Sequence, residues 1–262
     1  MNALQPDAVL FVGDLSDGDL RLTRRIAALP FPLAVILGNH DRGGDRSGDL
    51  LRQQLALLGG CNCGWTRLSW TNPALSIVGA RPCSAGGGFH LSKAVEAVFG
   101  PITLEESASR IVAAAQQVPE DQPLIVLAHS GPTGLGSDAS SPCGRDWKRP
   151  AIDWGDRDLA LALDSMASQR RPDLVVFGHM HHQLKRGHGL RRSLLQDRHG
   201  TAFVNAACVP RCGLDGKDQP VLHLSWAEFD GRRLTHVSHR WYTPEAVLVH
   251  QESLPLQDAV AC

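Results

Sequence analysis

Four short polar clusters in this sequence contain residue types that can hold a catalytic metal ion. Each cluster directly follows an apolar run that is typical of a buried strand. In chain order the clusters are Gly13-Asp14-Leu15-Ser16-Asp17, Gly38-Asn39-His40-Asp41, His129-Ser130-Gly131-Pro132 and Gly178-His179-Met180-His181. Their carboxylate, amide and imidazole groups are borderline-to-hard ligands, which suit Mn, Fe, Zn or Co and do not resemble an all-thiolate structural site.

Each cluster taken alone also has an ordinary structural interpretation. Asp14 could cap the helix that follows it. Asn39 and His40 could be turn residues, and His129 could be a buried histidine that binds nothing. One specified four-residue string arises by chance in a chain of this length at a rate on the order of one in several hundred. Because four chemically compatible clusters occur in order, each after a buried strand, the sequence favours a metal site.

The predicted secondary structure places the clusters at strand ends. We expect helices at residues 17–29, 49–58, 103–118 and 156–170, and strands at 8–12, 33–37, 75–78, 124–128, 174–177, 201–205, 221–229 and 234–241. This order predicts an α/β fold whose last strands form a second sheet. Ligands of open α/β sheets gather at the carboxyl ends of the strands, so the clusters meet there if their strands lie side by side.

Composition excludes several classes of protein. Of the 262 residues, 43% are apolar and 20% are charged, and the net charge is −1. These values exclude a disordered, collagen-like or coiled-coil chain, and the balanced charge argues against a nucleic-acid partner. The odd count of 7 cysteines indicates reduced thiols, and we find no signal peptide or membrane span. We therefore expect a cytoplasmic protein with a single domain at residues 1–243 and a C-terminal tail at 244–262.

The clusters resemble the signature of the calcineurin-like metallophosphoesterase superfamily, which reads D-x-H, G-D-x-x-D, G-N-H-[DE], a lone His and G-H-x-H. The resemblance covers residues 8–182, in the right order, and is greatest to an uncharacterised branch of cyanobacteria and plastids. It implies a two-sheet αββα sandwich with two divalent metal ions, Mn favoured, at the strand ends. It also implies hydrolysis of a small phosphorylated substrate by a hydroxide that bridges the metals.

Roles for individual residues follow from the resemblance by position. Asp14 would bridge both metals, and His181 would bind the second one. The first metal would be completed by Asn39, His129 and His179.

The resemblance also implies two catalytic residues that are not metal ligands. His40 would act on the leaving group. Asp17 would hydrogen-bond His40 and hold it charged.

Two departures from the family pattern affect these expectations. The D-x-H motif is absent, since only seven residues precede the strand that starts at Ala8. The second metal then keeps only Asp14 and His181, and the neighbouring strand has an unpaired edge. We expect a truncated chain, with upstream codons that encode a strand ending in Asp-x-His. Gly18 and Asp41 stand where family members that act on phosphoproteins have Arg and Glu, which argues against a protein phosphatase.

Two other functions remain open at this stage. A phosphodiesterase or nuclease would use the same metal chemistry, although a groove that tracks DNA should be basic. A non-catalytic relic would bind one metal or none and serve as an interaction module. The missing motif favours the relic, and the other four clusters favour the enzyme.

Three further features have alternative interpretations. Gly86-Gly87-Gly88 lacks the Gly-Lys-Ser/Thr of a phosphate cradle, so we expect a flexible loop. Trp147 and Trp154, near the end of the loop at residues 131–150, could stack on a base or anchor that loop to the core. His182 adjoins the expected metal ligands, and we expect it to point the opposite way.

Overall fold

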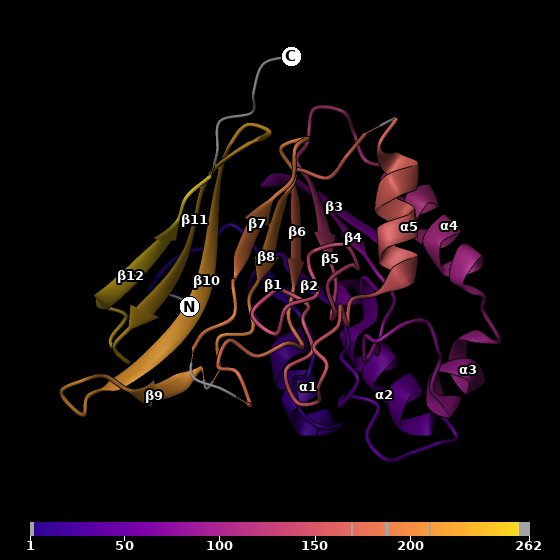
Figure 1. The fold of residues 1–262 in the computed structure, drawn as a ribbon, viewed down its shortest axis with the longest axis horizontal. Helices are drawn as coiled ribbons and strands as arrows, with labels where there is room; N and C mark the ends of the chain where they lie inside the picture. Colours follow the sequence, from indigo (N-terminus) through magenta and orange to yellow (C-terminus); the bar gives the residue numbers. More distant parts are fainter. Residues whose placement is uncertain (1–2, 169, 187–188, 210, 257–262) are drawn as a thin grey trace.

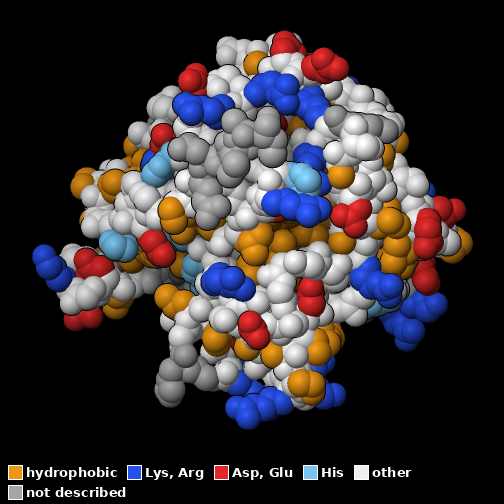
Figure 2. Space-filling model, turned by 45° about the horizontal axis from the view of Figure 1, so that its top comes forward, with side chains coloured by type: hydrophobic (Ala, Val, Ile, Leu, Met, Phe, Trp, Pro, Cys, Tyr) orange, Lys and Arg blue, Asp and Glu red, His pale blue; other side chains and the backbone are white. Residues whose placement is uncertain are grey.

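The computed structural model describes residues 3–168, 170–186, 189–209 and 211–256 (Figure 1). Helices and strands alternate along the first two thirds of the chain, and strands dominate the last third, which confirms the α/β prediction. Within the described ranges no helix combines the length and the apolar character that a membrane crossing requires. Figure 2 shows acidic and basic side chains interspersed over the visible face, in keeping with the net charge of −1.

The six-stranded sheet forms the centre of the molecule. Its order is β3-β4-β5-β6-β8-β7, with bounds Arg67–Thr71, Ala74–Gly79, Leu124–Leu127, Leu174–Phe177, Ala202–Asn205 and Leu194–Gln196 respectively. The four inner strands are parallel. All residues of β5 are buried, as expected for a parallel strand that is covered on both faces, and helices cover one of these faces. The covering helices are α4 (Leu104–Ala115) and α5 (Arg157–Met166), and α4 begins at the expected capping box of Thr103 and Glu106.

A separate two-stranded sheet carries the first two polar clusters. It pairs β1 (Val9–Phe11) with β2 (Leu33–Val35) in parallel, and within the described ranges β1 has no other ladder partner. Three helices follow or flank this part: α1 (Leu20–Ala27), α2 (Asp49–Leu58) and α3 (Lys93–Phe99), with a short 3₁₀ turn at Gly59–Cys61. The four cluster-bearing strands therefore belong to two sheets and do not lie side by side in one.

The last strands form a third sheet on the side of the molecule opposite α4 and α5 (Figure 1). Its order is β12-β11-β10-β9, with bounds Leu248–Leu254, Arg233–Tyr242, Pro220–Asp230 and Cys212–Leu214. The expectation of a C-terminal tail at residues 244–262 is wrong for Leu248–Leu254. These residues form β12, which pairs antiparallel with β11. All but the last residue of β12 are exposed, so backbone pairing rather than an apolar face defines this strand.

A cluster of buried histidines joins this third sheet to the loop after β6. His182 and His239 have ring centroids 4.9 Å apart in an edge-to-face arrangement, and His223 Nε2 lies 3.1 Å from His239 Nδ1. His182 thus packs on the third sheet, as expected for a side chain that points away from the metal clusters. Burial lowers the pKa of His223 to about 3 and that of His239 to about 4.

These two imidazoles should make the protein less stable in mild acid. Their folded pKa values lie below the unfolded value of about 6.5, so the unfolded chain takes up protons first as the pH falls. Stability is complete above about pH 6.5 and declines towards pH 4. We expect a loss of about 1–2 kcal/mol per histidine between pH 7 and pH 5, measured by urea unfolding. His239→Phe should flatten this pH dependence, and the same slope in wild type and variant would contradict the assignment. The exposed His90, changed to Gln, is the control and should keep the wild-type slope.

Candidate metal centre

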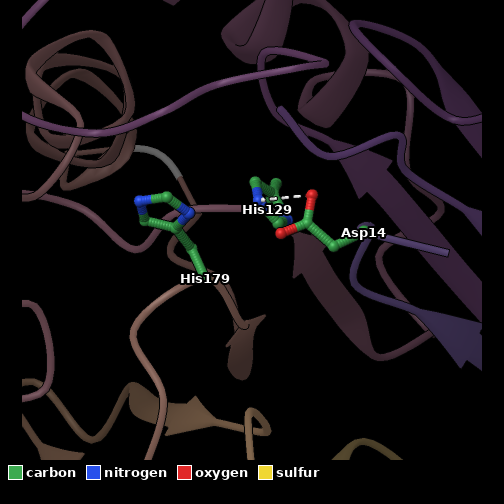
Figure 3. Close-up of side chains that lie close together, drawn as sticks. All are labelled: Asp14, His129 and His179. Atoms are coloured by element: carbon green, nitrogen blue, oxygen red, sulfur yellow. Dashed lines mark ion pairs between the residues drawn. The ribbon is translucent and has the colours of Figure 1, made fainter. Parts of the chain in front are cut away.

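Side chains from all four polar clusters are found where the two-stranded sheet meets the six-stranded sheet. Asp14, His129 and His179 each direct one oxygen or nitrogen into a common space, and these atoms lie within 4.8 Å of one another (Figure 3). Asn39 joins them, because its Oδ1 is 2.9 Å from Nε2 of His129. Asp14 Oδ1 is 3.4 Å from the same nitrogen. Four of the expected metal ligands are therefore neighbours.

The His129 ring is fixed by a hydrogen bond to the backbone. Its Nδ1 lies 2.6 Å from the carbonyl oxygen of Val12, which can only accept, so Nδ1 carries a proton. In the neutral ring, Nε2 then has a lone pair that faces the oxygens of Asn39 and Asp14. Three electron-pair donors converge with no hydrogen between them. This donor set calls for a cation, either a proton on the ring or a metal ion.

Without a metal ion, a proton on Nε2 of His129 is the cation between these donors. Burial lowers the pKa of His129, but the hydrogen bond and charge of Asp14 outweigh burial, and the net shift is upward. Burial likewise raises the pKa of Asp14, yet the His129 hydrogen bond and charge bring it down to about 2. The buried His129 ring and the more exposed Asp14 carboxylate thus form an ion pair. A divalent ion can take the place of the proton on Nε2 of His129.

His179 enters the site from the loop after β6 with a neutral ring. Burial, followed by repulsion from His129, lowers its pKa to about 3. The backbone of Ala85 has a smaller effect on this pKa, in the upward direction. Both His179 and Asp14 have positive φ angles, 63° and 53°. Such strained backbone is common where a side chain must be aimed at a functional site.

Asp41 links the first two polar clusters through hydrogen bonds to their backbone. Its buried carboxylate accepts hydrogen bonds from the backbone N–H groups of Leu15 (2.7 Å), Ser16 (3.1 Å) and Gly38 (2.8 Å). Burial is the main cause of an upward shift in its pKa. From the sequence, Asp41 stood out only as a variation on the family motif. Its acidic side chain beside two glycine-containing loops was the available signal for this role.

The remaining expected site residues lie towards solvent. The backbone N–H of His40 donates to Asp14 Oδ1 at 3.0 Å, and its exposed ring lies with Nδ1 3.1 Å from Asp17 Oδ1. His181 is exposed and does not belong to the group of converging ligand atoms among the described residues. Burial lowers the pKa of His181, and the charge of Asp14 opposes this shift. His181 therefore interacts electrostatically with Asp14 from outside the group of converging ligand atoms.

Two glycines allow the loops to approach this closely. A Cβ on Gly38 would lie 2.3 Å from Asp14 Oδ1 and 2.6 Å from His129 Cε1. A Cβ on Gly13, where φ is +89°, would lie 2.6 Å from His129 Nδ1. All three contacts are far shorter than van der Waals distances, so only glycine fits at these two positions.

Gly38→Ala should therefore distort the junction even without a metal. We expect the free energy of unfolding to fall by about 1–3 kcal/mol, measured by urea denaturation of the metal-free protein. Gly44→Ala is the matched control, because a Cβ there meets nothing within 4 Å, and its effect should stay within about 0.5 kcal/mol. Equal stabilities for the two variants would show that the close approach does not matter.

Comparisons with known proteins identify the family and the fold of this chain. The family model of the calcineurin-like phosphoesterases matches residues 1–183. No curated protein matches the chain. Among solved structures, the crystal structure of TT1561 of Thermus thermophilus is similar in fold, with 14% identity, a TM-score of 0.52, and coverage of 89% of this chain and 87% of that chain. The matched residues include all four polar clusters, and the chain belongs to the calcineurin-like phosphoesterase family.

Proposed function

We propose that this protein hydrolyses phosphoesters with the help of divalent metal ions held at the strand ends. Membership of the family supports metal-dependent phosphoester hydrolysis in general. The single observation that carries the proposal for this chain is the convergence of three lone-pair donors at Nε2 of His129, with no hydrogen between them in the neutral ring. A small phosphorylated molecule is the proposed substrate, and Mn²⁺ is the proposed ion.

The residues present fit a metal ion at one position and partly at a second. Asp14, Asn39, His129 and His179 would hold the first ion, with a mixed oxygen and nitrogen set that suits Mn, Fe, Zn or Co. Asp14 and His181 would contribute to a second. When bound, such ions lower the pKa of water and neutralise charge on phosphoryl oxygens.

His40 and Asp17 supply the proton chemistry in this proposal. His40 lies beside the ligand set through its backbone contact to Asp14, while its ring projects into solvent where a substrate can reach it. The Asp17 carboxylate lies 3.1 Å from Nδ1 of the ring and can orient it by a hydrogen bond. A protonated imidazole so placed can donate its proton to the departing oxygen of the ester.

A second candidate function is an interaction module that binds one metal ion. The observation that favours it is the exposed position of His181, outside the converging group among the described residues. Binding of a single ion without turnover of any phosphoester would select this candidate. Binding of two ions with turnover would select the hydrolase.

His40→Ala tests the proposed hydrolase and the role of this histidine together. Turnover of chromogenic phosphate monoesters and diesters with Mn²⁺ should fall by about 10²–10⁴-fold, because the leaving oxygen loses its proton donor. Metal content, measured by plasma mass spectrometry, should stay at the wild-type level. Loss of metal from the variant would make His40 a ligand instead. His199→Ala is the control for an exposed histidine, at the amino end of β8, and should keep wild-type activity.

A further inference from the structure

Arg191 is a buried arginine whose side chain contacts the loop that carries His179 and His181. It is only 3% exposed and lies shortly before β7. Its Nε donates a hydrogen bond to the backbone carbonyl of His181 at 3.0 Å. The backbone N–H of Arg191 donates to the carbonyl of His182 at 2.7 Å. The carbonyls of His181 and His182 are therefore both held by one residue.

The peptide that precedes His181 is held by a second buried side chain. Asn205, the last residue of β8, is 0% exposed. Its Nδ2 donates to the carbonyl of Met180 at 2.7 Å, and its Oδ1 accepts from the backbone N–H of Ala207 at 2.8 Å. Buried side chains from other segments thus bind the carbonyls on both sides of the His181 side chain. His181 is exposed, but its backbone is fixed.

The Arg191 guanidinium also binds the loop at residues 131–150. Its Nη1 donates at 2.8, 2.8 and 2.7 Å to three backbone carbonyls, those of Ala139, Ser141 and Gly144. The buried Asp146 carboxylate lies 3.6 Å from Nη2 of Arg191 and accepts a hydrogen bond from the backbone N–H of Lys185 at 2.6 Å. Arg191 and Asp146 therefore join this loop to the loop after β6.

The loop at residues 131–150 is a fixed attachment point, because the chain just after it packs against Ala85 and the two glycines that follow. The indole Nε1 of Trp154 donates to the Ala85 carbonyl at 3.0 Å. A Cβ on Gly86 would lie 2.8 Å from Trp154 Cδ1, and one on Gly87 would lie 2.4 Å from Cε2. Trp154 therefore anchors the loop, which is one of the two interpretations that the sequence left open. The expectation of a flexible glycine loop is wrong for Gly86 and Gly87.

The contacts of Arg191 depend on the shape of its guanidinium group. This group is planar and has five N–H donors in fixed directions. Its Nε faces one loop, while Nη1 and Nη2 face the other. Lysine has a single ammonium nitrogen, so it cannot donate to both loops in this arrangement.

We propose that Arg191 is a positioning residue of the metal centre, which fixes the backbone of His181 so that its ring is presented to a second ion from a constant position. This inference rests on the proposed function, since it requires an ion at His181. Arg191 acts through His181 and contacts no substrate in this role. Residues that orient a metal ligand from outside change metal affinity by about 10–100-fold when they are removed.

The first test is a Mn²⁺ titration by calorimetry on Arg191→Lys, with the thermal stability of the metal-free protein measured in parallel. The dissociation constant of the second ion should rise about 10–100-fold. The first ion should bind as in the wild type, because three of its four proposed ligands lie on other loops.

Arg170→Lys is the matched control for this titration. Arg170 also donates to three backbone carbonyls, those of Val118, Pro119 and Gln122. Its replacement should lower the stability of the protein without changing either Mn²⁺ affinity. A merely structural role of Arg191 would give the same result in both variants.

A second measurement needs neither metal nor activity. Backbone ¹⁵N relaxation gives an order parameter for the N–H group of His181, which we expect to be about 0.85 in the wild type, as in a rigid backbone. The order parameter should fall to about 0.6 in Arg191→Lys and stay unchanged in Arg170→Lys. A wild-type value below about 0.6 would overturn the inference, even if Arg191→Lys fails to fold.

The outcomes also distinguish this inference from the proposed function. Two Mn²⁺ ions bound by the wild type, with equal affinities in folded Arg191→Lys, would overturn the role of Arg191 alone. A wild type that binds no second ion would overturn the second metal position and this inference with it. Weaker binding of the second ion in Arg191→Lys, with unchanged affinities in Arg170→Lys, would support both.

Discussion

The ring of His129 connects the two-stranded sheet to the six-stranded sheet, because its two nitrogens contact different parts of the junction between them. Nδ1 donates to the Val12 carbonyl, just past the end of β1, at 2.6 Å, while Nε2 faces Asn39 at 2.9 Å, from the loop after β2. His129 itself follows β5 of the larger sheet and is only 1% exposed. A buried ring with both nitrogens engaged cannot turn without breaking one of these contacts. The spacing of the site residues therefore depends on how the two sheets meet.

Around this ring the site has a buried half and an open half. His129 is buried and His179 is half-buried, and the Val12 carbonyl places a proton on Nδ1 of His129. His40, Asp17 and His181 are exposed at the other side. A rigid, poorly solvated half favours fixed ligand geometry, whereas an open half admits a substrate. In the proposed function this division separates the residues that hold a metal from the residue that transfers a proton.

Sequence alone predicted the parts of this structure that rest on continuous burial. β5 and β6 were expected within one residue, because their apolar runs have no polar interruption. β12 was missed because only Leu254 in it is buried. The candidate ligands were found from polar residues after buried strands. The hydrogen bond from the Trp154 indole to the Ala85 carbonyl was not, since a contact between a side chain and a distant backbone carbonyl has no sequence signature and depends on tertiary packing. The division of the strands between sheets also depends on long-range pairing that local patterns do not encode.

The central claim is that the ligand set around His129 binds a divalent ion. Anomalous diffraction from crystals grown with Mn²⁺, recorded at the manganese edge, tests it most directly. We expect an anomalous peak in contact with Asp14, Asn39, His129 Nε2 and a ring nitrogen of His179, at distances of about 2.0–2.3 Å. A manganese peak at another position, or no peak at this junction, would contradict the claim.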